Sequence, residues 1–203
     1  MESQRTFKTL KSEVDHIFKV IKHLEYDVWY KYQKAVNKLP EKIFYLTTEE
    51  LLRTYPDLSP KERENKICKD KGCVFLVQIG KRLSNGEVHD NRAPDYDDWE
   101  LNGDILFWYE PLDCALEISS MGIRVDAKSL ESQLEIANCT DRKSLPYHQD
   151  VLNNKLPFSI GGGIGQSRLC MLLLKKAHIG EVQASIWPQS MIDKCTENNI
   201  LIL

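Results

Sequence analysis

The sequence lacks the features that mark membrane, secreted and general nucleic-acid-binding proteins. It contains no run of about 20 apolar residues, the length that a membrane-spanning helix needs. No apolar core of a secretory signal occurs in its first residues, MESQRTFKT. Lysine and arginine number 27 against 30 aspartate and glutamate, a net charge of −3, so a basic footprint for nucleic acid is also missing. We therefore expect a cytoplasmic protein with no membrane or nucleic-acid partner.

Cysteine and histidine motifs are missing as well. None of the six cysteines forms a C-x-x-C pair or has a histidine at zinc-finger spacing, and the five histidines include no H-E-x-x-H. Several cysteines stand in apolar runs, as Cys73 does before Val74. We therefore interpret them as small buried hydrophobic residues in a reducing compartment, and we expect no transition-metal site.

An ordinary globular composition is present, with one long amphipathic segment. Of the 203 residues, 42% are hydrophobic and 28% are charged, which suits a single domain over residues 1–203. Apolar side chains recur at three- and four-residue steps over positions 7–32. This pattern predicts a helix from near Met1 to about Val36, where Pro40 follows. Its wide apolar face indicates packing against a core.

Shorter elements follow, and strands cluster late in the chain. Strands are predicted over residues 43–46, 73–79, 104–110, 114–125, 158–164 and 182–187. Helices are predicted over residues 47–55, 60–72, 129–137, 147–153 and 166–176, and the first two begin with the capping-box pairs Thr47/Glu50 and Ser59/Glu62. Strands and helices do not alternate regularly, so the predicted class is α+β, an antiparallel sheet flanked by helices.

A glycine-rich stretch at a strand-to-helix junction is the most unusual segment. Arg168 follows it in the first turn of a helix, and the glycines are Gly161, Gly162, Gly163 and Gly165. Glycines let a backbone or a ligand approach closely, and the helix dipole disfavours a cation at a helix start unless a ligand needs it. Neither common phosphate-binding glycine motif fits the spacing. A nucleotide-binding turn and a tight packing turn both explain the stretch.

Three carboxylates lie close together in the segment R-A-P-D-Y-D-D-W. They belong to Asp95, Asp97 and Asp98. Such a group can hold an ammonium group or a cation, although EF-hand spacing fails because Trp99 takes the fifth position. A solvated acidic turn explains the same spacing.

Glu117 stands inside an apolar strand. By strand alternation it shares a face with Ala115, Ser119 and Met121. These neighbours leave room for a ligand or for Mg²⁺, which takes one or two carboxylates plus substrate phosphates. Arg124, further along, is able to clamp a carboxylate or a phosphate with two hydrogen bonds. An Arg124–Glu117 salt bridge on an exposed sheet face is the competing explanation.

Four segments, taken in order, carry a resemblance to a known family. They are R-A-P-D-Y-D-D-W, L-N-G-D-I-L, E-I-S-S-M-G-I-R-V-D and I-G-G-G-I-G-Q-S-R-L. The chain resembles asparagine synthetase A, the ammonia-dependent aspartate–ammonia ligase, from its first helix nearly to its C-terminus. The resemblance implies the catalytic fold of class II aminoacyl-tRNA synthetases. It also implies asparagine synthesis from aspartate, ammonia and ATP through a β-aspartyl-adenylate, with Mg²⁺ as cofactor and AMP and diphosphate as products.

The resemblance assigns roles to residues of this sequence. Arg168 matches the arginine that packs on adenine and reaches the phosphates, and Arg124 matches one that faces the substrate. Asp97 matches the acid placed to bind an amino group or ammonia, so these three are the catalytic candidates. The nucleotide-site matches are Arg168 again, Asp104, Glu117, Ser119, Ser120, Gly161, Gly162 and Gly163, and the Mg²⁺ matches are Asp104 and Glu117.

Parts of the family pattern are missing from these residues. No segment corresponds to motif 1, which builds the family's homodimer interface, or to motif 2, whose arginine contacts the α-phosphate. A loop that precedes L-N-G-D in relatives is shortened, so Trp99 and Glu100 run straight into Leu101. The resemblance thus implies the C-terminal portion of a class II core, as an incomplete chain or one half of a split ligase. The alternative is a catalytically inactive nucleotide- or amino-acid-binding remnant. A truncated tRNA-synthetase-like protein is disfavoured by the acidic charge.

Overall fold

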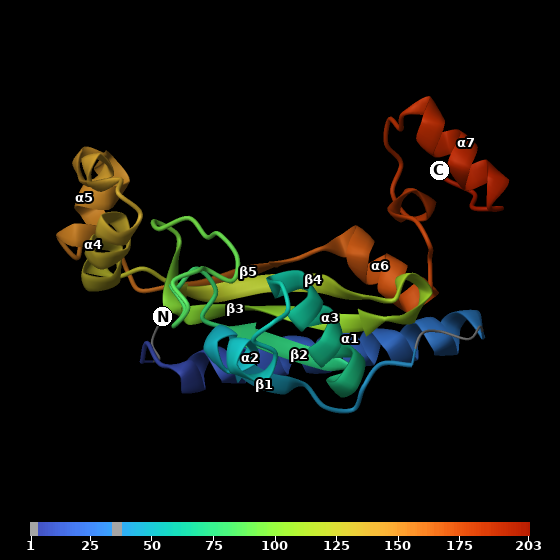
Figure 1. The fold of residues 1–203 in the computed structure, drawn as a ribbon, viewed down its shortest axis with the longest axis horizontal. Helices are drawn as coiled ribbons and strands as arrows, with labels where there is room; N and C mark the ends of the chain where they lie inside the picture. Colours follow the sequence, from blue (N-terminus) through green and yellow to red (C-terminus); the bar gives the residue numbers. More distant parts are fainter. Residues whose placement is uncertain (1–3, 34–37) are drawn as a thin grey trace.

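A five-stranded sheet forms the centre of the chain. The computed structural model describes residues 4–33 and 38–203. The strands lie across the sheet in chain order: β1 (Phe44–Thr47), β2 (Cys73–Val77), β3 (Asp97–Tyr109), β4 (Cys114–Arg124) and β5 (Ile160–Ile164). β1 pairs parallel with β2, and the other neighbouring pairs are antiparallel (Figure 1). The predicted α+β class is confirmed, with one parallel pair in a largely antiparallel sheet.

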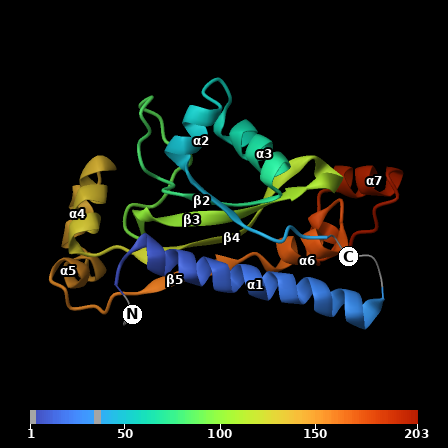
Figure 2. The ribbon, with the colours of Figure 1, turned by 90° about the horizontal axis from the view of Figure 1, so that it is seen from below.

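Helices cover both faces of this sheet (Figure 2). On one face, α1 (Phe7–Tyr32) and α6 (Gln166–Leu174) join apolar side chains of β2, β3 and β4 in a buried cluster. On the other face, α2 (Thr48–Thr54) and α3 (Pro60–Lys71) pack against Val74, Leu76 and Leu106. We call these the α1 face and the α3 face. Because close-packed apolar side chains cover both, the sheet holds its polar residues in fixed positions.

α1 begins later than predicted. Thr6 caps the helix by accepting a hydrogen bond from the Thr9 amide at 3.2 Å, so the helix begins at Phe7 and not near Met1. It ends at Tyr32, where Gln33 takes a left-handed φ of 51°. The predicted extension to position 36 falls on residues 34–37, which lie outside the described residues.

Local sequence signals set the starts and ends of the next two helices. Thr47 and Ser59 each form the predicted capping box with the glutamate three residues on. α3 stops at Gly72, whose φ of 77° is one that glycine adopts without strain. A Cβ at this position would also lie 2.6 Å from Cγ of Pro40, so glycine is required there twice over.

The segment after β4 builds a small helical layer at one end of the sheet (Figure 1). It consists of α4 (Ala127–Ile136), the 3-10 turn η2 (Thr140–Ser144) and α5 (Pro146–Leu152). Their apolar side chains form a separate buried cluster of Val125, Leu130, Leu134 and Val151. We call residues 127–152 the α4–α5 hairpin. The hairpin has its own small core. Its contacts with the sheet are therefore not needed to hold it together.

The predicted last strand over residues 182–187 is wrong. After the 3-10 turn η3 (Ile179–Glu181) the chain runs without regular structure to Pro188, and α7 (Gln189–Glu197), which the sequence pattern missed, follows. Ile186 is 98% exposed, so its apolar side chain signals no burial in a sheet. The segment stands apart from the strands in Figure 1, and apolar composition without a strand partner does not make a strand. None of the described helices is long and apolar enough to span a membrane.

The interpretation of the cysteines as buried residues is confirmed for some of them. Cys68, Cys73 and Cys195 are buried, and burial raises the pKa of the Cys68 thiol to about 12. Cys170, in α6, is exposed. The cysteines are all free thiols.

Candidate active site

Asp97 and Arg124 meet across two neighbouring strands. β3 begins at Asp97, earlier than predicted, so this part of the acidic stretch belongs to the sheet and is not a solvated turn. The strand register places Asp97 opposite Arg124, and their carboxylate and guanidinium are in direct contact. Tyr96 completes the group, because Arg124 Nη2 donates to its hydroxyl at 2.9 Å and Cζ lies 3.9 Å from its ring centroid. We call these three residues the acid end of the site.

The ion pair of the acid end is largely shielded from water, whereas Tyr96 is exposed. The side chains of Asp97 and Arg124 are 12% and 19% exposed. Burial raises the pKa of the Asp97 carboxyl, although the charge of Arg124 opposes the shift. A shielded carboxylate with a raised pKa is suited to taking up or releasing a proton, or to holding an ammonium group.

Glycines make this contact possible. A Cβ at Gly122 would lie 2.7 Å from Cγ of Asp97, and one at Gly161 would lie 2.6 Å from Nη2 of Arg124. Gly162 packs against the next strand in the same way, because its Cβ would lie 2.5 Å from that of Met121. A Cβ at Gly163, in contrast, would meet no atom within 4 Å. The glycine-rich stretch therefore combines tight packing at two positions with open space at the third.

Arg168 and Glu117 form a second ion pair further along the sheet. Arg168 lies in the first turn of α6, and its Nη1 is 3.3 Å from both Oε1 and the backbone oxygen of Glu117. The two side chains are 47% and 41% exposed. The proposed Arg124–Glu117 salt bridge is therefore absent, because each residue has a different partner. We call Glu117 and Arg168 the nucleotide end of the site.

Asp104 lies between the two ends, and sequence reasoning missed its partner. Arg92, from the loop before β3, contacts Asp104 directly through Nη2, and its charge also acts on Asp97. Burial raises the pKa of Asp104 to about 6 against the opposing charge of Arg92. Its Oδ1 atom is buried and has no hydrogen-bond partner among the described residues. The only sequence signal for Arg92 is that it opens the segment R-A-P-D-Y-D-D-W.

A β-bulge changes which side chains share the face of Glu117. The β3–β4 register shifts between Ile105, which faces Ser119, and Leu106, which faces Glu117. Because Ile118 is the extra residue, the alternation predicted beyond it is wrong. Met121 belongs to the core cluster of the α1 face, and Ser119 pairs with Ile105 of the same cluster. Ser120, paired with Asp104, shares the face of Glu117 instead.

The site can supply two carboxylates to a metal ion. Asp104 and Glu117 stand on neighbouring strands, and the negative charge of Glu117 contributes to the raised pKa of Asp104. In the part of the chain that the structure describes, no group of three or more His, Cys, Asp or Glu side chains is placed to hold a metal. Two carboxylates completed by substrate phosphates are a usual arrangement for Mg²⁺, and the unpaired Oδ1 of Asp104 fits it.

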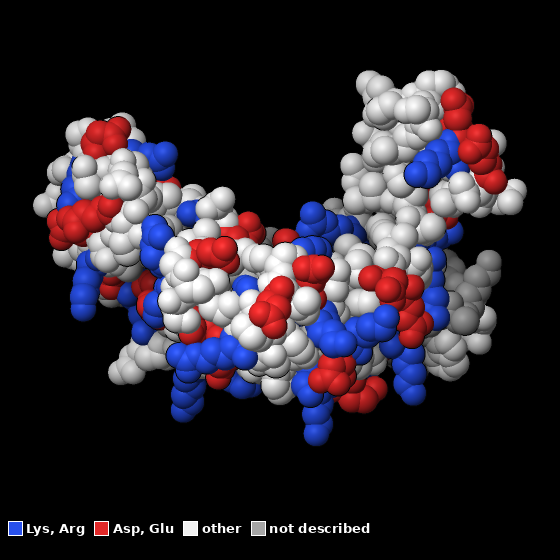
Figure 3. Space-filling model, viewed as in Figure 1, with Lys and Arg blue, Asp and Glu red and all other residues white. Residues whose placement is uncertain are grey.

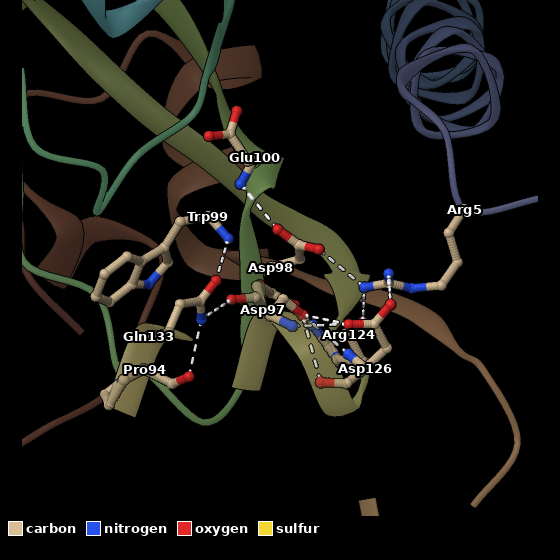
Figure 4. Close-up of polar contacts among 10 residues, drawn as sticks. Arg5, Pro94, Asp97, Asp98, Trp99, Glu100, Arg124, Asp126 and Gln133 are labelled. Atoms are coloured by element: carbon tan, nitrogen blue, oxygen red, sulfur yellow. Dashed lines mark hydrogen bonds and ion pairs between the residues drawn. The ribbon is translucent and has the colours of Figure 1, made fainter. Parts of the chain in front are cut away.

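Buried polar contacts anchor the start of β3 (Figure 4). Gln133 of α4 donates through Nε2 to the backbone oxygens of Pro94 and Asp97, at 2.8 and 3.1 Å, and its Oε1 accepts from the Trp99 amide at 2.8 Å. From the other side, Arg5 reaches Asp98 and the Arg124 backbone oxygen, each at 2.9 Å. Both strands of the acid end are thus tied to neighbouring elements.

On the face drawn in Figure 3, the charged residues show no segregation by sign. Figure 3 shows acidic and basic side chains interspersed across this view, and a wide hollow between the α4–α5 hairpin and α7. A cavity of about 810 Å³ lies elsewhere, between α1 and β1, and contains none of the paired residues described above. A smaller one of about 230 Å³ lies on the α1 side of β5 and includes Ser119. The chemistry is concentrated on the sheet surface and not in either cavity.

The chain matches one protein family over nearly its full length. The family model described as aspartate-ammonia ligase matches residues 1–199. A protein named aspartate--ammonia ligase from Pediococcus pentosaceus is 67% identical over 202 residues, and one of the same name from Levilactobacillus brevis is 65% identical. Each alignment covers 100% of this chain and 60% of the relative. The chain therefore spans about 60% of the length of the curated relatives it matches.

Solved structures share the fold at low sequence identity. Aspartyl tRNA synthetase from Entamoeba histolytica matches with a TM-score of 0.63 at 15% identity, covering 90% of this chain and 41% of that one. Asparaginyl-tRNA synthetase from the same organism, in complex with asparaginyl-adenylate, matches with a TM-score of 0.59 at 16% identity, covering 88% and 44%. The predicted class II synthetase-like fold is confirmed.

Proposed function

The chain belongs to the aspartate-ammonia ligase family, and from this premise we propose that it carries part of the active site of an enzyme making asparagine from aspartate, ammonia and ATP. The observation that supports the proposal is a row of three carboxylate–guanidinium pairs across β3, β4 and the start of α6. Guanidinium groups bind carboxylates and phosphates with paired hydrogen bonds. The row thus suits a pair of substrates of which one is an amino acid and the other a nucleotide.

The proposed reaction has two steps. An oxygen of the aspartate β-carboxylate attacks the α-phosphorus of ATP, and the bond from that phosphorus to diphosphate breaks, leaving β-aspartyl-adenylate. Ammonia then attacks the β-carbonyl carbon, the bond from that carbon to the AMP oxygen breaks, and the nitrogen loses a proton to give the amide. Negative charge builds on oxygen in both steps, and fixed guanidinium groups stabilise it.

In this proposal the nucleotide lies over Glu117 and Arg168. The Arg168 guanidinium is half exposed and held by one long ion pair and one long hydrogen bond to Glu117, so it can turn toward adenine and the phosphates at little cost. The open space above Gly163 gives the nucleotide a floor without side chains. Ser120 is on the same face, whereas Ser119 is not, so only Ser120 is retained among the two serines as a nucleotide contact.

Aspartate and ammonia occupy the acid end in this proposal. Arg124 is held in place by Asp97 and Tyr96, and its remaining N–H groups face the substrate carboxylate. Asp97 binds an ammonium or amino group and is able to accept the proton that the nitrogen loses. Its raised pKa favours this role, because a carboxylate with a higher pKa is a stronger base.

Mg²⁺ is the proposed cofactor, and Asp104 and Glu117 would hold it. When bound, it neutralises phosphate charge and polarises the phosphoryl oxygens. Arg92 occupies one oxygen of Asp104 and leaves Oδ1 for the ion. Because the pKa of Asp104 is raised to about 6, its carboxylate takes up a proton as the pH falls through that value. The proton would compete with the metal, so Mg²⁺ affinity should fall with it.

The decisive experiment is an assay that detects both asparagine and AMP. The purified gene product is incubated with aspartate, ammonium, ATP and Mg²⁺, and both products should form in equal amounts. Arg124→Ala and Arg168→Ala should each reduce the rate by at least about 100-fold, the usual cost of removing one charge-stabilising donor. AMP without asparagine would contradict the proposed ligase.

A second candidate function is an inactive module of the same fold that binds a nucleotide or an amino acid. Its ligand site would be the same exposed Glu117–Arg168 pair, which can bind a nucleotide whether or not a reaction follows. Such a module should bind ATP without turnover, and Arg168→Ala should abolish that binding. Calorimetric titration with ATP in the absence of aspartate separates the two functions.

Two further proposals concern assembly and location. We expect a homodimer, as the family resemblance implies, and a cytoplasmic protein. Sedimentation of the purified gene product, at concentrations from 1 to 100 times that of the assay, tests the first. Cell fractionation tests the second.

A further inference from the structure

Both helices of the α4–α5 hairpin form hydrogen bonds with residues 94–99, the acidic stretch of the site. From α4, Gln133 is buried and makes three hydrogen bonds to the backbone of residues 94–99. From α5, His148 is buried and its Nε2 lies 3.0 Å from Oδ2 of Asp95. Arg142 of η2 donates to the same oxygen at 2.9 Å. One helix thus fixes the backbone of the stretch while the other fixes a side chain.

The His148 ring is held as a directed donor. A carboxylate accepts hydrogen bonds and cannot donate them, so Nε2 carries the proton in the contact with Asp95. Nδ1 is buried without a hydrogen-bond partner among the described residues, so Nε2 is the ring nitrogen that anchors the side chain. Arg142, His148 and burial act together on Asp95, and the net effect lowers the pKa of its carboxyl, so it stays charged.

The held residue is adjacent to the acid end. Asp95 is followed directly by Tyr96 and Asp97, whose side chains contact the guanidinium of Arg124. Tyr147, which precedes His148, lies close enough that the charges of Asp95 and Asp97 add to the effect of burial in raising its pKa. A displacement of Asp95 would therefore move both groups that orient Arg124.

We propose that Gln133 and His148 are positioning residues, which set the place of Asp97 and Arg124 by holding residues 94–99 from the α4–α5 hairpin. The inference rests on the proposed function, since it assigns the acid end to substrate binding. Neither residue contacts the carboxylate or guanidinium that would meet the substrate. Both act through the backbone or through Asp95.

These contacts are separable from the stability of the hairpin. Its small core is made by Val125, Leu130, Leu134 and Val151. His148 contacts Tyr147 edge-on and Asp95 through its ring nitrogen, and belongs to none of that core. A change at His148 therefore removes the contact with Asp95 and leaves the apolar packing of the hairpin in place.

The test compares three variants of His148 in the complete gene product. His148→Ala removes the donor. His148→Gln places an amide nitrogen near the position of Nε2, and His148→Asn places one near that of Nδ1, away from Asp95. Lys143→Ala is the matched control, because the Lys143 ammonium pairs with Glu131 and Glu135 inside the hairpin and not with Asp95.

The first readout does not depend on activity. Amide hydrogen exchange of Trp99, whose N–H is bonded to Gln133, reports whether residues 94–99 stay in place. We expect exchange at least about tenfold faster in His148→Ala and His148→Asn, and within about threefold of the parent in His148→Gln and Lys143→Ala. Unchanged exchange in His148→Ala would overturn the proposal.

The second readout is steady-state kinetics. His148→Ala should reduce kcat/KM for aspartate by about 10- to 100-fold, a usual cost of displacing a site by about 1 Å, with KM for ATP within about twofold of the parent. His148→Gln should restore most of the loss. An equal loss for aspartate and ATP, or no rescue by glutamine at an unchanged melting temperature, would overturn the positioning role.

Two further measurements keep the outcomes distinct. Gln133→Leu replaces the buried amide by a side chain of similar size, and the Trp99 amide should exchange faster in this variant. It provides a separate test if His148→Ala unfolds the hairpin. If the parent protein makes no asparagine, the proposed function fails. Trp99 exchange in the His148 series then decides the positioning proposal by itself.

Discussion

The two ends of the site are built in opposite ways. At the acid end, Asp97 and Arg124 are 12% and 19% exposed and are surrounded by anchoring contacts. At the nucleotide end, Glu117 and Arg168 are 41% and 47% exposed and are joined by an ion pair and a hydrogen bond, both of 3.3 Å. The first arrangement is fixed before a ligand arrives, whereas the second can rearrange around one.

This difference has an energetic basis. A buried ion pair is costly to break, because the remaining charge stays without its partner in a medium that solvates it poorly. An exposed pair contributes little, since water and salt screen both charges. The acid end should therefore resist change, and the nucleotide end should tolerate it.

The largest effect is expected from removing one arginine at each end. Arg124→Ala should lower the free energy of unfolding by about 3 kcal/mol, because it leaves Asp97 buried without its partner. Arg168→Ala should lower it by less than about 1 kcal/mol. Urea denaturation at pH 7.5 measures both, and equal losses would remove the contrast between the two ends.

The second test uses two glycines of the same strand. Gly161→Ala adds a methyl group 2.6 Å from Nη2 of Arg124, whereas the methyl group of Gly163→Ala meets nothing within 4 Å. We expect Gly161→Ala to destabilise the fold by about 2 kcal/mol and to reduce kcat/KM for aspartate by about 10-fold or more. Gly163→Ala should change stability by less than about 0.5 kcal/mol.

Crystallography of Gly161→Ala would show whether Arg124 has moved. An unmoved arginine combined with lost activity would mean that the methyl group acts on the substrate directly. In that case the close approach of glycine and guanidinium is not what fixes the acid end.

The third test concerns Asp104, which lies between the ends. Its pKa of about 6 in the folded protein is above the value of about 3.9 expected in the unfolded chain. The folded protein thus binds this proton more tightly, so the contribution of Asp104 to stability declines as the pH rises from about 4 to about 6 and does not return above that.

Asp104→Asn removes this titration. The variant should gain about 2 kcal/mol relative to the parent between pH 4.5 and pH 7.5, since a shift of one pKa unit corresponds to about 1.4 kcal/mol. Parallel urea titrations of the two proteins across this range provide the measurement. A constant difference across the range would mean that Asp104 is charged throughout and belongs with the well-paired acid end.

The smallest effect is expected at Ser119. Its hydroxyl is buried on the α1 face without a partner among the described residues, so Ser119→Ala should change stability by less than about 0.5 kcal/mol and leave KM for ATP unchanged. Ser120→Ala, on the other face, should raise KM for ATP by about threefold or more. Reversed effects at the two serines would contradict the bulge at Ile118.

Much of the fold could be predicted because its signals are local. The capping boxes at Thr47 and Ser59 and the helix stop at Gly72 each depend on residues a few positions apart. The strand β2 is predicted closely for a similar reason, since its apolar run is continuous. Family resemblance added the catalytic candidates through collinear motifs.

The errors arose where distant contacts decide the outcome. The segment 182–187 is as apolar as a strand, yet it pairs with none of the strands of the described residues. Likewise, the inserted residue Ile118 is visible only once β3 is aligned with β4. No spacing rule connects Arg92 with Asp104 or His148 with Asp95, because the partners come from different elements.

The sequence by itself determined the family, the α+β class and most helix boundaries, because these depend on residue type, periodicity and short-range hydrogen bonds. Only the tertiary structure decided which carboxylate meets which guanidinium. It paired Arg124 with Asp97 and left Glu117 to Arg168, since strand register and the glycines at 122 and 161 control how closely those side chains approach. Charge alone allows every such pairing, and packing selects among them.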